Sequence, residues 1–293
     1  MSQSTNSTVA RLLITCQDKP GIIAAISTFL KKHGANITEL DQHSTDPEGG
    51  TFFMRLEFQT AYLDISNEMF EKAFLEEVAK PFSMTWQLHY AKNIKKVALL
   101  VSKHDHAFLE VLWRWSRGEL PIDIACVISN HAALQSQAAH FNVPFYHLPV
   151  TEQTKPQAEE KMLEICQQNQ INLIVLARYM QILSSRVIEA FTHRIINIHH
   201  SFLPAFVGAN PYQQAYEKGV KLIGATAHYV SDELDMGPII AQDVVRVTHR
   251  LSVEKLKELG QSIEKSVLAR AIQSHAEDRI IIYGNKTIVF ELT

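Results

Sequence analysis

Between residues 97 and 199 the sequence alternates short apolar runs with longer segments in which apolar residues recur at helical spacing. The apolar runs predict strands at 97–101, 122–128, 145–148, 173–177 and 195–199. The segments between them predict helices at about 107–117, 132–141, 157–168 and 184–191. Strands that alternate with helices form a mainly parallel sheet covered on both faces. The sequence therefore predicts a doubly wound α/β domain, with ligands beyond the carboxyl ends of its strands.

The N-terminal third has a different order of elements. It predicts strands at 10–16, 36–43, 51–58 and about 83–89, with helices at about 20–33 and 66–80. We expect Asp18 to cap the first helix and Gly34 to end it, because these residue types favour those positions. A basic stretch at 92–96 separates this βαββαβ module from the α/β domain. Two domains are therefore expected, at 8–91 and 95–293.

Composition argues against several classes of protein. The net charge of the 293 residues is −3, which disfavours binding to nucleic acid through charge. Three cysteines (Cys16, Cys126 and Cys166) form no CxxC pair, which is typical of reduced thiols in the cytosol. The N-terminus lacks the apolar core of a signal peptide, and no run reaches the roughly 20 apolar residues that cross a bilayer. We expect a cytoplasmic protein that binds neither nucleic acid nor membrane.

Polar side chains at the ends of two expected strands in the second domain indicate carbonyl chemistry. Asn197 and His199 are two positions apart on the strand 195–199, so they project from the same face. A second strand-like run, 222–230, leads into a turn that contains three carboxylates, Asp232, Glu233 and Asp235. An amide, an imidazole and a carboxylate can together polarise a carbonyl, stabilise an oxyanion and transfer a proton. The set predicts acyl transfer without a covalent nucleophile.

A metal site is the alternative for the same histidines. His199 and His200 could combine with His228 or Asp235. However, neighbouring residues on a strand point to opposite faces, so His199 and His200 cannot ligate one ion without a local bend. No cysteine lies nearby and no HExxH motif occurs, so we expect no metal.

Longer motifs surround these residues. The segments 197–204 (NIHHSFLP), 224–228 (GATAH) and 232–240 (DELDMGPII) resemble the formyltetrahydrofolate-dependent formyltransferase family. Within it, the adjacent histidines, the run 204–212 (PAFVGANPY) and the N-terminal module are similar to the deformylase branch, over about residues 8 to 290. The resemblance implies hydrolysis of 10-formyltetrahydrofolate to formate and tetrahydrofolate. That reaction would supply formate for purine biosynthesis and balance one-carbon pools.

The resemblance also suggests roles for individual residues. Asn197 and His199 would stabilise the oxyanion. Asp235 would hold a water, orient His199, or take the proton of the water and pass it to N10. The pterin would lie between the segment 178–183 and the loop 229–235, and His200 would lie behind the catalytic set or in the acceptor pocket. The implied substrate-binding residues are Met180, Gln181, Ile182, Leu183, His200 and Tyr229. Folate and water are the expected substrates, and no cofactor is implied.

The turn after the strand 97–101 bears on the identity of the acceptor. Related transformylases of a ribonucleotide carry a Gly- and Ser-rich loop there, whose backbone N–H groups bind phosphate. In this chain the turn reads Ser-Lys-His-Asp-His (102–106), without glycine. We therefore expect water as the acceptor, and a transferase with an amine acceptor is the alternative. We also expect His104 and His106 to lie in a solvated loop, with Lys103 free to hold an anion.

The N-terminal module resembles an ACT domain, a small regulatory module that commonly binds amino acids. Its Asp-Lys-Pro-Gly-Ile turn (18–22) and its Gly-Ala-Asn-Ile segment (34–37) carry the resemblance. Asp18, Gly34 and Asn36 are therefore the candidates for effector binding, with glycine or methionine as the implied effector. Edge-to-edge pairing of such sheets implies a homo-oligomer. A structural module that binds no ligand is the alternative.

Three other functions compete with hydrolysis. A methionyl-tRNA formyltransferase is disfavoured because little chain follows the last expected helix, at about 253–275. A formyltetrahydrofolate dehydrogenase is disfavoured because no aldehyde dehydrogenase domain is found. An amino-acid-sensing protein with an inactive enzyme fold is disfavoured by the intact set of Asn197, His199 and Asp235.

Overall fold

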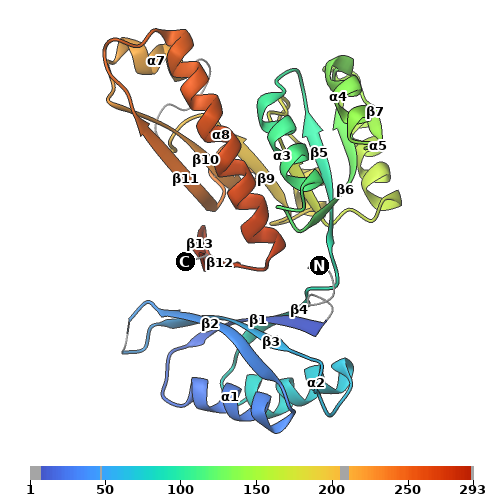
Figure 1. The fold of residues 1–293 in the computed structure, drawn as a ribbon, viewed down its shortest axis with the longest axis vertical. Coiled ribbons are helices and arrows are strands. Elements are labelled where there is room, and N and C mark those ends of the chain that lie inside the picture. Colours follow the sequence, from blue (N-terminus) through green and yellow to red (C-terminus); the bar gives the residue numbers. More distant parts are fainter. Residues whose placement is uncertain (1–7, 47, 205–210, 292–293) are drawn as a thin grey trace. The chain divides into compact units, whose positions relative to one another are not determined.

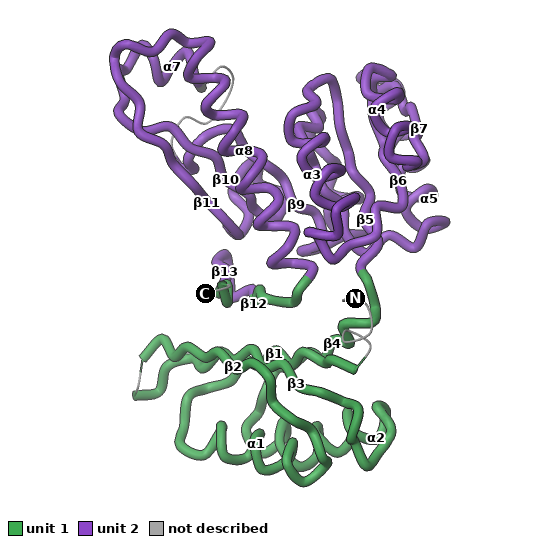
Figure 2. The backbone as a smooth tube through the Cα atoms, in the orientation of Figure 1, with its two compact units in different colours: residues 1–94, 277–281, 288–293 green, residues 95–276, 282–287 purple. Residues whose placement is uncertain are grey.

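The computed structural model describes residues 8–46, 48–204 and 211–291. These residues form two compact units, which Figure 2 draws in different colours. The first unit contains the chain up to Ile94 together with 277–281 and 288–291, and the second contains 95–276 and 282–287. The sequence-based division placed the whole C-terminal segment in the second domain. Parts of that segment instead group with the first unit.

The first unit is a four-stranded antiparallel sheet with two helices (Figure 1). Its elements are β1 (Val9–Gln17), α1 (Ile22–Lys32), β2 (Asn36–Ser44), β3 (Thr51–Gln59), α2 (Asn67–Phe74), a π-helical turn η2 (Leu75–Ala79) and β4 (Thr85–Tyr90). The strand order is β2-β3-β1-β4, so β2 and β4 are the edge strands. Apolar residues of the sheet and both helices form one core, in which Phe29 contacts Phe70 and Phe74 edge to face. The predicted βαββαβ order is confirmed.

Both ends of α1 depend on a glycine. The helix begins after Gly21, which has φ +95° and occupies the N-cap position without any side-chain cap. The prediction that Asp18 caps this helix is therefore wrong, because the helix starts three residues later. Its carboxylate instead accepts a hydrogen bond of 2.5 Å from the Ser44 hydroxyl. Gly34 ends the helix as predicted, with φ +75°, and a Cβ atom there would lie 2.4 Å from the Tyr62 backbone oxygen.

A buried ion network attaches the C-terminal segment to the sheet of the first unit. The Arg55 side chain on β3 is 1% exposed, and its guanidinium lies 3.0 Å from the Glu39 carboxylate. Arg279 approaches the same carboxylate at 2.9 Å, and Arg55 also donates to the Asp278 backbone oxygen at 3.2 Å. A buried charge is stable only with such partners. The network explains why residues around Arg279 group with the first unit.

The second unit is built on a seven-stranded sheet of order β11-β10-β9-β8-β5-β6-β7. The strands β5 (Lys95–Val101), β6 (Ile122–Ser129), β7 (Phe145–His147), β8 (Leu173–Leu176) and β9 (Ile195–His199) are parallel. The strands β10 (Leu222–Tyr229) and β11 (Ile239–Arg246) are antiparallel. The helical elements are α3 (His106–Ser116), the short η3 (Ala132–Leu134), α4 (Gln135–His140), α5 (Lys155–Gln168), α6 (Ser185–Ala190), α7 (Pro211–Glu217) and α8 (Val253–Ala276). The predicted mainly parallel α/β fold is confirmed.

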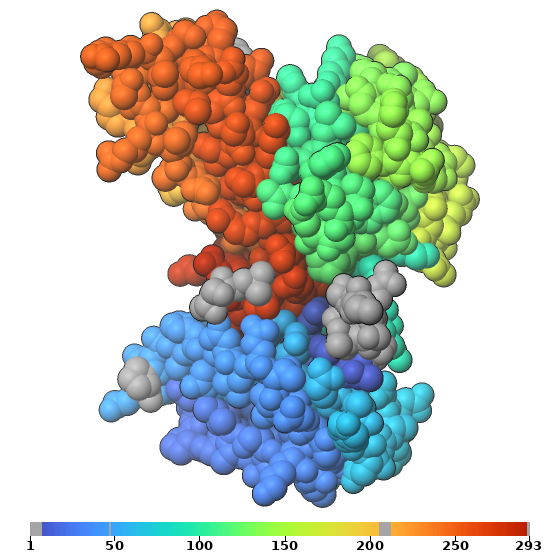
Figure 3. Space-filling model, viewed as in Figure 1, coloured from blue at the N-terminus to red at the C-terminus, as the bar shows by residue number. Residues whose placement is uncertain are grey.

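Helices cover both faces of this sheet. On one face, Ala98 and Leu100 of β5 pack in one cluster with Met162 of α5 and Val187 of α6. On the other face, α3 and α8 lie side by side, and in the space-filling view the orange-red part of the chain that contains α8 adjoins the green part that contains α3 (Figures 1 and 3). The carboxyl ends of the parallel strands meet at one edge of the sheet, so the turns after β5, β8 and β9 come together there.

Among the described residues, four elements were not predicted. They are the edge strand β11, the short helix α7, and a hairpin of β12 (Ile280–Tyr283) and β13 (Lys286–Val289) that follows α8 in the chain. Part of the run 204–212, which contributed to the family resemblance, lies outside the described residues, at 205–210.

Candidate active site

The catalytic candidates on two neighbouring strands project from one face of the sheet. Asn197 and His199 are on β9, and the register with β10 places His228 opposite Asn197 and Thr226 opposite His199. Directly opposed residues of an antiparallel pair project from the same face. The strand geometry therefore brings the four side chains together, as the sequence spacing predicted for Asn197 and His199.

Asp235 reaches this face from the turn between β10 and β11. Its Oδ2 lies 3.2 Å from Nδ1 of His199. The residue has φ +57°, a left-handed conformation that aspartate tolerates better than most residues. Gly237 lets the turn close, because a Cβ atom there would lie 1.8 Å from the Tyr229 backbone oxygen. The hydrogen bond from His199 lowers the pKa of Asp235 despite its partial burial, so this group is a carboxylate at neutral pH.

His228 fixes the orientation of Asn197. Its Nδ1 lies 2.9 Å from the Tyr229 backbone oxygen, which can only accept, so Nδ1 carries a proton. Burial lowers the pKa of this imidazole, and the neutral ring leaves Nε2 as an acceptor. Asn197 Nδ2 donates to that nitrogen at 3.3 Å. From the sequence, His228 had been considered only as a metal ligand.

His199 presents a ring nitrogen without a protein partner. With Nδ1 facing Asp235, its Nε2 is buried and has no hydrogen-bond partner among the described residues. Leaving a buried polar atom unsatisfied costs about 1–3 kcal/mol, so this nitrogen is available to a ligand or a water molecule. Asn197 Nδ2, on the same face, has a second N–H that His228 does not use. The two groups can together hydrogen-bond one carbonyl oxygen.

Thr226 anchors the chain that leaves β9. Its hydroxyl donates to the Ser201 backbone oxygen at 2.9 Å and accepts from the Leu203 N–H at 3.0 Å. The Gln242 side chain donates to the same hydroxyl at 2.9 Å and to the Leu203 oxygen at 3.0 Å. Thr226 is fully buried, so these bonds hold the segment after β9 in one path. The sequence could not identify Thr226 or Gln242, because their roles depend on strand register.

The segment 178–183, expected to bind the pterin, leaves the carboxyl end of β8. It is held in place by the Met180 N–H, which donates to the Ser102 hydroxyl at 2.9 Å. Four large apolar side chains on this segment and beside Asp235 remain more than half exposed: Met180 (55%), Ile182 (63%), Leu234 (59%) and Met236 (52%). Exposed apolar groups near convergent polar groups indicate a surface that a ligand covers.

Two residues expected in the pterin pocket have other contacts. Tyr229 projects from the opposite face to His228, and its hydroxyl is hydrogen-bonded to Nδ1 of His275 at 2.7 Å. Its backbone N–H and carbonyl are also bonded within the protein, so the assignment of Tyr229 to the pocket was wrong. Leu183 is 7% exposed and packs in the hydrophobic core, so it anchors the end of the segment 178–183 rather than lining a pocket. Gln181 is half-buried in the same segment.

The turn after β5 is not the solvated loop that was expected. Lys103 and Asp105 are exposed, but the His106 side chain is buried and its Nε2 lies 2.8 Å from a carboxylate oxygen of Glu264 on α8. Burial, together with nearby positive charge, lowers the pKa of His104. The local pattern could not reveal this arrangement, because Glu264 lies far along the chain.

The histidines do not assemble a metal site among the described residues. No group of three His, Cys, Asp or Glu side chains there is placed to hold a metal ion. His199 and His228 approach Asp235 at 3.2 and 3.7 Å, but Nε2 of His228 already accepts a hydrogen bond from Asn197. This geometry does not favour the metal alternative.

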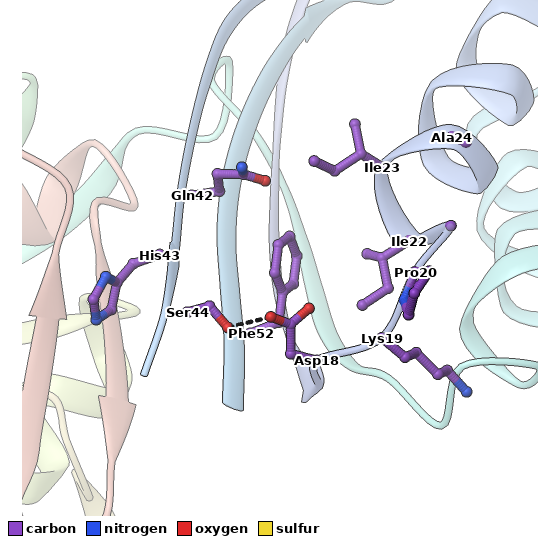
Figure 4. Close-up of a pocket in the computed structure, with 11 residues that line it drawn as sticks. Asp18, Lys19, Pro20, Ile22, Ile23, Ala24, Gln42, His43, Ser44 and Phe52 are labelled. Carbon is purple, nitrogen blue, oxygen red and sulfur yellow. Dashed lines mark hydrogen bonds between the residues drawn. The ribbon is translucent and has the colours of Figure 1, made fainter. Parts of the chain in front are cut away.

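The first unit contains a pocket of ≈ 330 Å³ at the start of α1 (Figure 4). The turn 18–24, residues 42–44 of β2 and Phe52 line it, and Figure 4 shows the Asp18 carboxylate joined to Ser44. Asp18 therefore lines this pocket, and its role in effector binding stays a prediction. Gly34 and Asn36 do not line it, because they lie at the opposite end of β2, where Asn36 pairs with β3. The direction of β2 brings Gln42 and Ser44 to the pocket instead.

Comparison with known proteins covers both units. Residues 95–272 match the Formyl transferase family, and residues 10–61 match the ACT domain. The chain is 52% identical to the formyltetrahydrofolate deformylase of Bacillus subtilis, over 97% of this chain and 95% of the relative. A solved formyltetrahydrofolate deformylase from Pseudomonas syringae superimposes with a TM-score of 0.93 at 46% identity, covering 99% and 96% of the two chains. A glycinamide ribonucleotide transformylase from Symbiobacterium toebii gives 0.64 at 31% identity, over 68% and 95%.

Proposed function

The chain belongs to the formyltetrahydrofolate deformylase family, and we propose that it hydrolyses 10-formyltetrahydrofolate to formate and tetrahydrofolate. It is then a hydrolase that breaks the C–N bond between the formyl group and N10. The observation that carries the proposal is the buried, unpartnered Nε2 of His199, on the same face as Asn197 and oriented by Asp235. The formate would supply purine biosynthesis and balance one-carbon pools.

In the first step, the formyl oxygen accepts hydrogen bonds from Asn197 Nδ2 and His199 Nε2. In this step the Asp235 carboxylate holds Nδ1–H of His199, and the formyl oxygen binds the N–H at Nε2. Both donors interact more strongly as the oxygen becomes an oxyanion, which lowers the barrier rather than only binding the substrate. His228 keeps the amide in the donating orientation.

In the second step, the other oxygen of Asp235 holds the attacking water. Oδ1 lies 3.7 Å from Nε2 of His228, which is too far for a hydrogen bond, and that nitrogen has no proton to donate. The water attacks the formyl carbon and gives its proton to the carboxylate. As the C–N10 bond breaks, that proton passes to N10. The products are tetrahydrofolate and formic acid, which ionises to formate.

Water is the proposed acceptor, and an amine is the less supported alternative. The turn 102–106 contains no glycine, so it lacks the backbone cradle that a phosphate-bearing acceptor needs. Its last residue, His106, is buried against Glu264 rather than free to bind an acceptor. The proposed steps use no metal and no redox cofactor.

The pterin is assigned to the loop after β8. Met180 and Ile182 supply exposed apolar walls, and the backbone around Gln181 is placed to read the polar edge of the ring. Leu183 fixes the end of the loop by its burial in the core. His200 follows His199 directly and is assigned to the acceptor side.

For the first unit, an amino-acid effector is proposed in the pocket of Figure 4, with glycine and methionine as candidates. The Asp18 carboxylate matches an ammonium group. The N-terminus of α1 has neither a side-chain cap nor an acidic residue in its first turn, so its free N–H groups match a carboxylate. Ile23 and Phe52 add apolar walls, which favour methionine over glycine.

A homo-oligomer is proposed from the edge of the same sheet. β2 is an edge strand and most of its side chains are exposed. An open edge is a template for pairing with a second copy of the chain. No helix among the described residues is long and apolar enough to cross a membrane, and a cytoplasmic location is proposed from the folate chemistry.

The test is incubation of the chelator-treated protein with 10-formyltetrahydrofolate alone. Equal amounts of formate and tetrahydrofolate support the proposal. A formylated amine that forms only when an amine is added, with no formate in its absence, would favour a transferase. Activity recovered only with metal would restore the metal alternative. Calorimetric titration with glycine and methionine tests the effector, and no binding of either would leave the first unit a structural module.

A further inference from the structure

A fully buried carboxylate lies near the catalytic centre. Glu264, in the middle of α8, is 1% exposed, and three side chains converge on it. His106 Nε2 lies 2.8 Å away, the Tyr212 hydroxyl donates at 3.0 Å, and Arg178 Nε lies 3.6 Å away. A buried carboxylate is stable only with such partners. These four residues, called here the Glu264 network, therefore form one unit.

The partners of Glu264 come from separate segments around the catalytic centre. His106 ends the turn after β5, Arg178 starts the loop after β8, and Tyr212 lies on α7, beyond the end of β9. Arg178 has φ +66°, and its Nε is buried without a hydrogen bond among the described residues. Its guanidinium is therefore held beside Glu264 by charge. The network fixes the positions of three segments that meet at the carboxyl edge of the sheet.

The space for Tyr212 is built into α8. A Cβ atom on Gly260, one turn before Glu264, would lie 2.0 Å from the Tyr212 hydroxyl oxygen. A glycine inside a helix destabilises it by about 1 kcal/mol relative to alanine. The helix therefore has a destabilising glycine at the position where any side chain would displace Tyr212. The absence of a side chain at Gly260 is what allows the tyrosine to reach Glu264.

His200 connects the network to the catalytic set. Its ring centroid lies 5.1 Å from that of His199 and 6.1 Å from that of Tyr212. Burial, together with the positive charge of Arg178, lowers the pKa of His200 to about 4. At neutral pH the ring is therefore uncharged, with one donor and one acceptor nitrogen. Such a ring can orient a water molecule next to His199.

We infer that the Glu264 network determines acceptor specificity: it fills the acceptor side of the centre and leaves space beside His200 only for water. The inference rests on the proposed hydrolysis. His106 comes from the turn that a phosphate-bearing acceptor would need, and Glu264 holds its side chain at 2.8 Å. His106, Arg178, Tyr212 and Glu264 are positioning residues, because they act through His200 and through the volume that they occupy.

Opening the network is expected to admit a small amine. Hydroxylamine is a suitable probe because it is small and largely unprotonated at neutral pH. Its nitrogen would attack the formyl carbon, the C–N10 bond would break, and a proton from the attacking nitrogen would pass to N10. The products would be formohydroxamate and tetrahydrofolate in place of formate and tetrahydrofolate.

The experiment measures the ratio of formohydroxamate to formate in single turnovers of 10-formyltetrahydrofolate with excess hydroxylamine, corrected for reaction without protein. His106→Ala opens one side of the network, and Gly260→Ala displaces Tyr212 while favouring the helix. Each is expected to raise the ratio by about tenfold over the wild type, which corresponds to about 1.4 kcal/mol. Tyr212→Phe is the matched control and is expected to keep the wild-type ratio, because its ring still fills the space.

Because it is a ratio of products, the readout does not depend on the fraction of folded protein. An unchanged ratio in both His106→Ala and Gly260→Ala would overturn the inference. Complete loss of formate and formohydroxamate in both variants would also overturn it, because the network would then be required for the catalytic step. If one variant fails to fold, the other decides, since they act from different elements. A wild type that releases no formate would instead contradict the proposed function.

Discussion

The two units hold their candidate ligand-binding residues in different ways. In the second unit, His199 and Asp235 are nearly buried, and His228 and Thr226 fix the amide and the strand end next to them. In the first unit, the pocket lies between a turn and the end of an edge strand, and Asp18 is held by the Ser44 hydroxyl. Chemistry on a carbonyl needs donors fixed before the reaction, whereas reversible binding of a small solute does not. Substitutions should therefore be tolerated in the first site far better than in the second.

The largest effect is expected at the catalytic set. Asn197→Ala, His199→Ala and Asp235→Asn should each reduce kcat by about 10²–10³-fold, the effect of removing one oxyanion donor or proton carrier. Formate release at saturating substrate measures this, with circular dichroism to show that each variant is folded. Near-normal turnover in any one of the three would remove that residue from the mechanism.

In the first unit the sensitive positions are structural. Gly34→Ala should destabilise the protein by about 1–2 kcal/mol for the left-handed conformation alone, and by more because the new Cβ would meet the Tyr62 oxygen. Gly49→Ala is the matched control, since Gly49 has φ +78° but no atom near its Cβ position. Chemical denaturation measures both. Equal losses in the two variants would show that the contact with Tyr62 has no energetic weight.

A smaller effect is expected at His228, which supports the catalytic set without touching the substrate. His228→Phe removes the acceptor for Asn197, and the loss of one hydrogen bond of about 1 kcal/mol corresponds to about a fivefold fall in kcat. KM should change little, and His228→Gln should recover part of the rate because it restores an acceptor. A loss as large as that of Asn197→Ala would mean that His228 contacts the reacting atoms.

The smallest effect on catalysis is expected at the effector pocket. In Asp18→Ala the ratio of rates with and without the effector should fall to one, because the ammonium partner is lost. Asn36→Ala, at the far end of β2, is the control and should respond as the wild type does. Rates measured across a titration of methionine, and then of glycine, give both ratios. A normal response in Asp18→Ala would place the effector outside this pocket.

Regular elements could be predicted from the sequence because their apolar residues recur with one clear period. The strands β5, β6, β8 and β9 are buried on both faces and appear as continuous apolar runs. The edge strand β11 was missed because most of its side chains are only partly buried or exposed, so it carries no such pattern. The helix α7 is only 7 residues long, too short for its periodicity to be recognised.

The site was predicted only as far as local rules reach. The period of a strand places Asn197 and His199 on one face, and the family resemblance supplied Asp235. The roles of His228 and Thr226 follow from the register between β9 and β10, and the burial of His106 follows from a residue on α8. Strand register and contacts between distant segments are tertiary properties that one sequence does not reveal. The same limit explains the misplacement of Asn36.

The proposed attack of water on the formyl carbon is tested most directly by following oxygen-18 from solvent water into formate in a single turnover. Excess protein is mixed with 10-formyltetrahydrofolate in water enriched in oxygen-18, with no amine present, and the formate is analysed by mass spectrometry. In the proposed reaction, water held by Asp235 attacks the formyl carbon directly, so the first turnover should give formate that carries at least one solvent oxygen. Unlabelled formate from the first turnover would show that its new oxygen came from a protein group, and would contradict the account.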